Sequence, residues 1–331
     1  MDVFYASDDR YAQHLGVSIS SVLTHSKSPI NFHILDGGIS EYKKSIILDL
    51  LNNSPMSKIE FIPVDNDIFD DFPCSERFTV ASYYRCIIHE LKPEIDKAIY
   101  LDCDVVANCC LGEFFAIDLE ENYAAVVEDF NILMDERKAV LNLPAGSRYF
   151  NSGVLLLNLK KIRTDAVFSQ ILPLLDKYEK FLDYYDQDLL NVLFVGKVKF
   201  VEPWWNVMEI VFRKNGIHCQ NRFYNNKKFK YYNNNPKIIH YANRSTLWFD
   251  GASQFLHKFW LDYYWYYKKT KFYSGIRQFP CFLFLKKQLK NLTFKKCKRW
   301  ILRIHLTSNR RIIRIMGLYI VDWKKKEFSI C

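Results

Sequence analysis

Short apolar runs and helix-like segments alternate along the first hundred residues, and this pattern limits the possible folds most. Apolar runs that suit strands occupy residues 3–6, 30–35, 59–64 and 98–101, and segments with helical spacing of apolar residues lie between them at 11–23, 40–50 and 79–91. Strands that alternate with helices favour an α/β fold with a mostly parallel sheet. Such a sheet binds its ligands at the carboxyl ends of its strands.

The pattern continues less regularly to about residue 250. Further strands are expected at 124–127, 153–157 and 237–239, and helices at 166–181 and 187–194. Residues 213–236 are rich in Asn, Lys and Tyr and predict a loop. Since the chain has 331 residues, we expect one large domain over 1–255 and an appended region over 256–331.

The appended region differs sharply from the rest in charge. Residues 258–331 hold 19 Lys and Arg against three acidic residues, a net charge of +16, whereas residues 1–257 carry 27 basic and 34 acidic residues, a net charge of −7. Aromatic residues interleave with lysines at 259–269, and leucines and lysines at 283–295 suggest helices. We expect a mainly helical tail that meets an anionic membrane surface. Nucleic acid is the weaker alternative because no nucleic-acid motif accompanies the charge, and a merely solvated basic tail stays open.

No run of about 18–20 apolar residues suggests a membrane span. The first residues lack the basic and apolar pattern of a signal peptide, and the nine cysteines form no C-x-x-C pair. We therefore expect a cytoplasmic protein with reduced thiols that lies peripherally on the inner face of the cell membrane.

Two carboxylates follow directly on the strand at 98–101. Asp102 and Asp104 are two positions apart, so in extended backbone both side chains point the same way. Two adjacent anions are costly unless a cation neutralises them, and oxygen ligands suit Mg²⁺ or Mn²⁺. An added imidazole would favour Mn²⁺. The alternative is a polar turn in which both carboxylates are solvated.

Other polar residues fall near expected strand ends or helix starts. They are Asp8 and Asp9 after the first strand, Arg85 before the Asp102 strand, Asp186 and Asp188 at a helix start, and His240 after 237–239. This is the edge where an α/β sheet binds ligands. His240 taken alone would more often fill a core or capping role.

Six blocks of sequence together resemble glycosyltransferase family 8, particularly its bacterial lipooligosaccharide and lipopolysaccharide galactosyl- and glucosyltransferases. They are F-Y-A-S-D-D-R-Y-A at 4–12, F-H-I-L-D-G-G-I-S at 32–40, Y-L-D-C-D-V at 100–105, Y-F-N-S-G-V-L-L-L-N-L at 149–159, Y-D-Q-D-L-L-N at 185–191 and I-I-H-Y at 238–241. The blocks keep the family order and cover roughly residues 1–250. D-x-D alone is a weak signal, whereas six ordered blocks are specific.

The resemblance implies a nucleotide-sugar-binding, Rossmann-like domain of the glycosyltransferase A type, with a UDP-hexose donor and Mn²⁺, Mg²⁺ being possible. It implies metal ligation by Asp102, Asp104 and His240. It also implies that Ala6, Asp8, Tyr11, Arg85 and Cys103 contact the nucleotide sugar, that Asn151, Ser152, Asp186 and Gln187 line the donor hexose, and that Asp129 faces the acceptor. The implied acceptor is a lipid-linked surface oligosaccharide.

Family 8 enzymes retain anomeric configuration. A double displacement would need a carboxylate nucleophile, and the residue at the family's candidate position, Gln187, is an amide. We therefore favour attack by the acceptor hydroxyl on the same face as the leaving group, with Gln187 stabilising the cationic sugar.

One block departs from the family pattern. The family usually reads H-Y-x-G-x-x-K-P-W after the histidine, but here Asn243, Thr246 and Leu247 replace the Gly, Lys and Pro. The lost lysine would have touched the diphosphate, and Arg244 or Arg10 could supply a cation instead. Two alternatives follow: a catalytically impaired nucleotide-sugar-binding or scaffold protein, and an enzyme of the same fold acting on a protein or free sugar. The sequence leaves the hexose, the linkage and the oligomeric state open.

Overall fold

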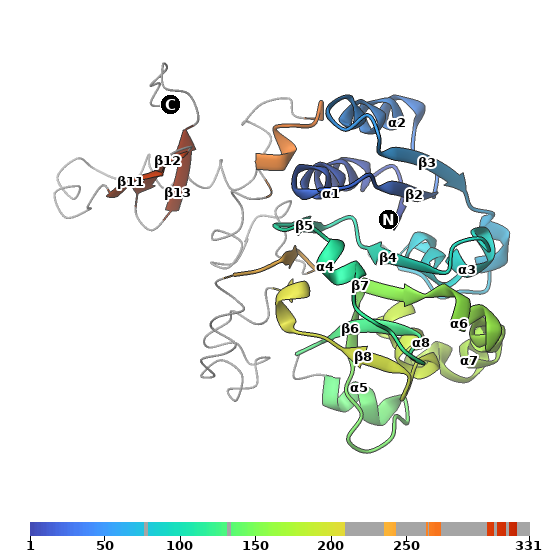
Figure 1. Ribbon diagram of the computed structural model, residues 1–331. Coiled ribbons are helices and arrows are strands. Elements are labelled where there is room, and N and C mark those ends of the chain that lie inside the picture. The colour runs from blue at the N-terminus through green and yellow to red at the C-terminus, as the bar shows by residue number, and fades with distance from the viewer. Residues whose placement is uncertain are drawn as a thin grey trace.

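The computed structural model describes residues 1–75, 79–130, 134–208, 235–242, 263 and 265–272, and the backbone of 303–307, 310–315 and 318–322 (Figure 1). The loop expected at 213–236 lies almost wholly outside these residues. The 243–248 block and the helices expected at 283–295 lie outside them entirely. The five cysteines within the described part, Cys74, Cys86, Cys103, Cys109 and Cys110, are free thiols.

A seven-stranded sheet forms the centre of the protein. Its order is β3 (Lys58–Pro63), β2 (Asn31–Asp36), β1 (Asp2–Ser7), β4 (Lys97–Leu101), β7 (Phe150–Asn158), β6 (Ala124–Glu128) and β8 (Val198–Phe200). Only β7 runs against its neighbours β4 and β6, and the other pairs are parallel. The expected α/β fold with a mostly parallel sheet is therefore confirmed.

Helices cover both faces of this sheet (Figure 1). Helices α1 (Ala12–His25) and α2 (Glu41–Leu48) follow β1 and β2, whereas α6 (Leu159–Thr164), α7 (Ile171–Tyr178) and α8 (Asp186–Leu193) follow β7. Strand β1 places Val3 and Tyr5 in one hydrophobic cluster and Phe4 in the other, because successive side chains of a strand point to opposite faces. Two apolar layers thus fix the sheet, and its strand ends remain for polar residues.

A small second sheet lies next to the end of β4. It consists of β5 (Val105–Ala107), β10 (Ile238–His240) and β9 (Val207–Met208), with β10 in the middle. His240 pairs in register with Val105, which directly follows Asp104. This pairing carries a histidine from late in the chain to the two early aspartates.

The helix expected at 79–91 is wrong in form. The structure has two short 3₁₀ turns, η3 (Val80–Ser82) and η4 (Tyr84–Cys86), and only four α-helical residues in α3 (Ile88–Leu91). Residues 83–86 are all buried, and the buried Arg85 is held by ion pairs to Asp102 and Asp186 that apolar spacing does not register. The helix expected at 166–181 is present but divided, with η5 (Val167–Gln170), α7 and η6 (Glu179–Phe181). The short helices α4 (Gly112–Phe115) and α5 (Met134–Val140) were not expected.

The tail is less helical than expected where the structure describes it. Strands β11 (Arg303–Thr307), β12 (Arg310–Ile315) and β13 (Leu318–Asp322) form an antiparallel sheet, although we expected a mainly helical region. Isoleucine and valine recur in these strands, and β-branched residues favour extended backbone. Residues 265–267 are helical, as expected, and pack against α1. Among the described residues, no helix combines the length and apolar character needed to cross a membrane.

Candidate functional site

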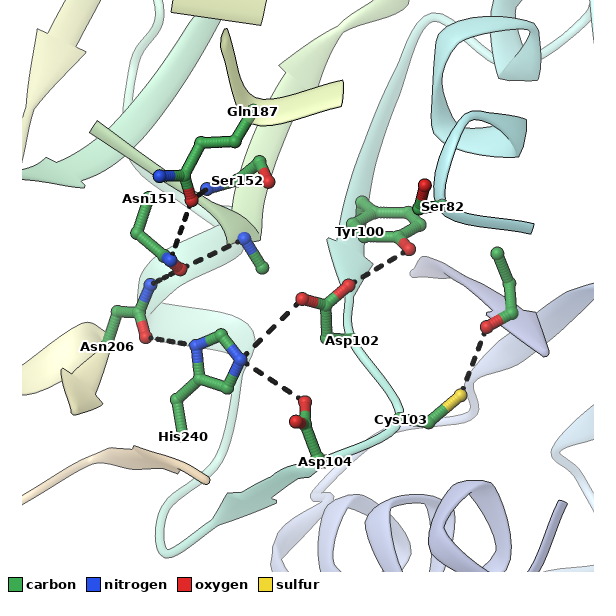
Figure 2. A network of polar contacts seen from close by, with 12 residues as sticks. Ser82, Tyr100, Asp102, Cys103, Asp104, Asn151, Ser152, Gln187, Asn206 and His240 are labelled. Atoms are coloured by element: carbon green, nitrogen blue, oxygen red, sulfur yellow. Dashed lines mark hydrogen bonds and ion pairs between the residues drawn. The ribbon is translucent and has the colours of Figure 1, made fainter. Parts of the chain in front are cut away.

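Asp102, Asp104 and His240 meet at the carboxyl end of β4, as Figure 2 shows. Each offers one ligand atom, and these three atoms all lie within 4.8 Å of one another. The Nε2 atom of His240 is 3.2 Å from Asp104 Oδ1 and 3.6 Å from Asp102 Oδ2. Two carboxylate oxygens and one imidazole nitrogen suit Mn²⁺, and the residues therefore fit a divalent cation.

Asn206 fixes which nitrogen of His240 faces the carboxylates. Its Oδ1 atom lies 2.9 Å from His240 Nδ1, and its Nδ2 atom donates to Asn151 Oδ1 at 2.8 Å (Figure 2). Because the Asn206 oxygen needs a donor, the proton belongs on Nδ1. Nε2 is then free to bind a metal, an arrangement common for histidine ligands. No sequence motif pointed to Asn206.

His240 and Asp104 shift each other's pKa in opposite directions. Burial alone would raise the pKa of Asp104, but attraction by His240 and the hydrogen bond between them lower it. Burial alone would lower the pKa of His240, but the same carboxylate raises it. The carboxylates of the site thus favour positive charge on the buried imidazole, as they would favour a bound cation.

Gly153 leaves the space in which the ligands meet. A Cβ atom at this position would collide with His240 Cε1 and Asp102 Oδ2 and lie 3.0 Å from His240 Nε2. The backbone of Gly153 also accepts the amide proton of Asp102 at 2.8 Å. Strand β7 therefore passes closer to the ligands than any residue with a side chain would allow.

Arg85 binds the side of Asp102 that faces away from His240. Its Nη2 atom lies 2.9 Å from Asp102 Oδ1, which also accepts from Tyr100 Oη at 3.1 Å. Its Nε atom lies 3.2 Å from Asp186 Oδ2, and its Nη1 atom donates to the Ser152 carbonyl at 2.7 Å. Arg85 thus joins the D-x-D segment to β7 and α8 and leaves Asp102 Oδ2 for a cation.

The start of α8 directs consecutive side chains into the site. Tyr185, just before the helix, has φ +46°, a left-handed conformation unusual for a bulky residue and typical of functional sites. Asp186 accepts from Ser152 Oγ at 3.0 Å, and burial raises its pKa to about 6 although Arg85 opposes the shift. Gln187 Oε1 accepts from Asn151 Nδ2 at 2.9 Å, and Gln187 Nε2 donates to Asp129 Oδ2 at 3.3 Å.

Asp188 faces away from this group, and its two oxygens are heavily bonded. Oδ1 accepts from Tyr149 Oη at 2.6 Å, and Oδ2 accepts from Arg137 Nη2 at 2.6 Å and from two backbone amides. The carboxylate is fully buried. It therefore fastens α5 to α8 and presents no oxygen to a ligand.

The residues expected at the nucleotide lie together at the end of β1. Asp8 Oδ1 accepts from the Tyr11 amide at 3.0 Å, its Oδ2 accepts from Arg10 at 3.3 Å, and Cys103 Sγ donates to the Ala6 carbonyl at 3.1 Å. Asp9, which the sequence also singled out, instead accepts from the Ser40 amide and pairs with Lys43 at 2.6 Å. It ties the β1–α1 loop to α2. Every residue expected at a metal, donor or acceptor position therefore belongs to one connected region of the fold.

Comparison with known proteins finds the same family that the six sequence blocks resemble. The family model described as glycosyl transferase family 8 matches residues 2–252. A protein of Haemophilus influenzae that is named as a glycosyltransferase is 35% identical over 209 residues, which cover 62% of this chain and 63% of that protein. The lipopolysaccharide 1,2-glucosyltransferase of Escherichia coli is 26% identical over 260 residues, covering 76% of this chain and 74% of the enzyme. The structure of the galactosyltransferase LgtC, in complex with donor and acceptor sugar analogues, aligns with a TM-score of 0.69 and 27% identity over 82% of this chain and 96% of that chain.

Proposed function

We propose that this chain, which belongs to glycosyltransferase family 8, transfers galactose or glucose from a UDP-sugar to a lipid-linked surface oligosaccharide. The observation that carries the proposal is the Asp102–Asp104–His240 cluster, joined through Arg85 to the expected donor-sugar residues. The transferases named above act on lipopolysaccharide or transfer galactose, which supports the substrate class.

The three clustered side chains would hold Mn²⁺, with Mg²⁺ as the alternative ion. Asp102 Oδ2, Asp104 Oδ1 and His240 Nε2 are the ligand atoms that this geometry offers. When bound, the ion stabilises the negative charge that develops on the departing UDP.

The chain's own residues would then bind and orient the donor. Ala6, Asp8, Tyr11 and Cys103 would hold the nucleoside, with Asp8 accepting hydrogen bonds and Tyr11 stacking on the base. Arg85, Asn151, Ser152 and Asp186 would line the hexose. Because the contacts of Arg85 and Gln187 already join several of these residues, the proposed donor site would be largely preformed.

We propose attack from the same face as the leaving group, with retention of configuration. The acceptor oxygen forms a bond to the anomeric carbon while the bond from that carbon to the phosphate oxygen breaks. The bonding electrons leave with UDP, and the acceptor proton passes to a phosphate oxygen. Gln187 would stabilise the cationic sugar through its carbonyl oxygen, and Asp129, bonded to the Gln187 amide, would face the acceptor.

Both carboxylates that flank Gln187 in the sequence already make polar contacts. Asp186 is bonded to Arg85 and Ser152, and Asp188 is enclosed by Arg137, Tyr149 and backbone amides. Mass spectrometry of enzyme quenched during turnover should find no hexose on any side chain. A hexosyl adduct on Asp186 or another residue would overturn the same-face mechanism.

The altered 243–247 block supports one rival reading, a binding protein with impaired catalysis. Arg10, 60% exposed and paired with Asp8, lies between Asp8 and Tyr11 in the sequence and could replace the family's lysine at the diphosphate. The full chain should be assayed with UDP-galactose and UDP-glucose, with and without Mn²⁺, on a lipid-linked oligosaccharide, followed by linkage analysis of the product. Metal-dependent transfer of one hexose is the expected result. UDP binding without any turnover would favour the impaired protein, and transfer only to a protein or free sugar would favour the other rival.

The +16 tail would place this catalytic domain on the inner face of the cell membrane. Lysine and arginine attract anionic headgroups, and aromatic rings favour the interface. We keep 1–255 as the proposed catalytic domain and 256–331 as the proposed membrane-association region, although Tyr263 and Tyr266 contact α1.

A further inference from the structure

Tyr263 and residues 265–272 form what we call the aromatic clasp, which packs along α1. Its buried members are Tyr263, Tyr266, Tyr267 and Thr270. Figure 1 shows the segment in orange above α1. The hydroxyls of Tyr263 and Tyr266 contact histidines at opposite ends of that helix, His14 and His25.

A glycine of helix α1, Gly16, lies directly against this segment. A Cβ atom at Gly16 would lie 2.9 Å from Phe272 Cε2, closer than real Cβ atoms approach. The glycine has ordinary helical backbone, so its missing side chain serves packing rather than a turn. A side chain at this point of the helix would therefore have to displace the Phe272 ring.

Tyr263 contacts two segments that belong to the proposed donor site. Its hydroxyl lies 2.6 Å from His14 Nδ1, and its ring meets the Tyr241 ring edge-on at 5.7 Å between centroids. The residue is 1% exposed. Tyr263 thus joins the first turn of α1 to the residue that follows His240.

His14 and Tyr241, the two partners of Tyr263, each contact a proposed ligand-binding residue. On one side, the His14 ring packs edge-on against Tyr11 at 5.5 Å, where Tyr11 is the proposed base-stacking residue. On the other side, the Tyr241 amide donates to the Asp104 carbonyl at 2.9 Å. The nucleoside side and the metal side of the site are therefore linked through one phenol.

We propose that Tyr263 is a positioning residue for nucleotide binding, acting through His14 on Tyr11 and through Tyr241 on the His240–Asp104 segment. The inference rests on the proposed function, because it assumes that UDP and a divalent ion bind at this site. It gives the start of the tail a role in donor affinity in addition to any role at a membrane.

Tyr266 provides a matched control within the same clasp. Its hydroxyl lies 2.8 Å from His25 Nε2, so both tyrosines make the same kind of bond to a histidine of α1. The two histidines are 11 residues apart, which is about 16 Å along a helix. A loss of clasp packing affects both variants, whereas a loss of positioning affects only Tyr263→Phe.

The test measures UDP binding to the full-length protein by calorimetry in the presence of Mn²⁺, together with the melting temperature, for wild type, Tyr263→Phe and Tyr266→Phe. Tyr263→Phe should raise the Kd for UDP by about fivefold or more, and Tyr266→Phe by less than about twofold, with similar falls in melting temperature. Should Tyr263→Phe fail to fold, His14→Phe combined with Tyr263→Phe removes both polar partners together and should show the same loss of affinity.

An unchanged Kd in the Tyr263 variant, or equal changes in the two tyrosine variants, would overturn the positioning role and leave the proposed function intact. Wild-type protein that binds no UDP in the presence of Mn²⁺ would overturn the proposed function, and the inference with it.

Discussion

The two carboxylate oxygens of Asp102 face different partners. Oδ1 is bound by Arg85 and Tyr100, and Oδ2 faces His240. An adjacent guanidinium would normally compete with a metal for a carboxylate. Here Arg85 binds Oδ1 and leaves Oδ2 for the proposed metal ion, so the two cations do not compete for one oxygen.

The smallest substitution with a large expected effect is Gly153→Ala. The new methyl group would displace His240 or Asp102, so Mn²⁺ affinity should fall at least about tenfold and overpacking should cost about 1–3 kcal/mol in the free energy of unfolding. Calorimetric Mn²⁺ titration and chemical denaturation measure both quantities. Gly112→Ala is the control, since its nearest neighbour, Cys110 Sγ, lies at an ordinary 3.5 Å. Normal metal binding by Gly153→Ala would show that the clustered atoms are not the ligands.

The sequence pointed to the charged residues of the candidate site but not to the neighbours that position them. Asp102 and Asp104 stand out because their spacing sends both side chains to one side of an extended segment, and the family blocks added His240. Asn206 and Gly153 gave no such signal in isolation. Asn206 acts through a hydrogen bond across 34 positions and Gly153 through the space it leaves, and neither property has a local pattern.

At the scale of elements, helix α1 carries a buried histidine whose neutral form stabilises the fold. Burial lowers the pKa of His14 to about 3 from its usual value near 6.5. Below about pH 6.5 this histidine is protonated in the unfolded chain but stays neutral in the folded protein. The free energy of unfolding therefore falls as the pH falls. Between pH 7 and pH 5 this group alone should cost about 2 kcal/mol.

Urea denaturation at a series of pH values measures that slope in wild type and in His14→Gln. The variant lacks the titrating group, so its stability should change less over the same range. Parallel curves for the two proteins would contradict the assignment of a buried neutral His14.

Helices α5 and α8 are joined by a buried ion pair between Arg137 and Asp188. Arg137→Leu would leave the fully buried Asp188 carboxylate without its cation, and breaking such a pair costs about 3–5 kcal/mol. Asp183→Asn removes only an exposed partner of the same arginine and should cost less than about 1 kcal/mol. Denaturation curves for both variants provide the measurement, and equal losses would show that the buried pair has no special weight.

The apolar pattern predicted the type of several elements correctly. Strand β1 and helices α1 and α8 lie close to where the apolar pattern puts them. The helix expected at 79–91 is wrong in form, because Arg85 is buried by charge pairing that apolar spacing does not register. Strand β5 was missed because its three residues pair with β10, more than 130 positions later.

The net charge of +16 on residues 258–331, against −7 on residues 1–257, predicts that the tail binds anionic lipid. Full-length protein should sediment with phosphatidylglycerol vesicles, and replacing Lys286, Lys287 and Lys290 by Gln should weaken this by about 1 kcal/mol per lysine. The control replaces three lysines of the body, Lys160, Lys177 and Lys180. Equal binding by both triple variants, or equal binding to neutral phosphatidylcholine, would contradict a membrane role for the tail.

The proposed activity depends on a divalent ion bound by the Asp102–Asp104–His240 cluster. The most direct measurement is UDP release from UDP-galactose and UDP-glucose by wild type, Asp102→Asn, Asp104→Asn and the surface control Asp176→Asn, with Mn²⁺ and with a chelator. We expect Mn²⁺-dependent release by wild type and Asp176→Asn, and a loss of at least about a hundredfold in the two site variants, since each removes a charged ligand. Undiminished metal-dependent release by either site variant would contradict the claim, as would a wild-type protein that releases no UDP from either donor.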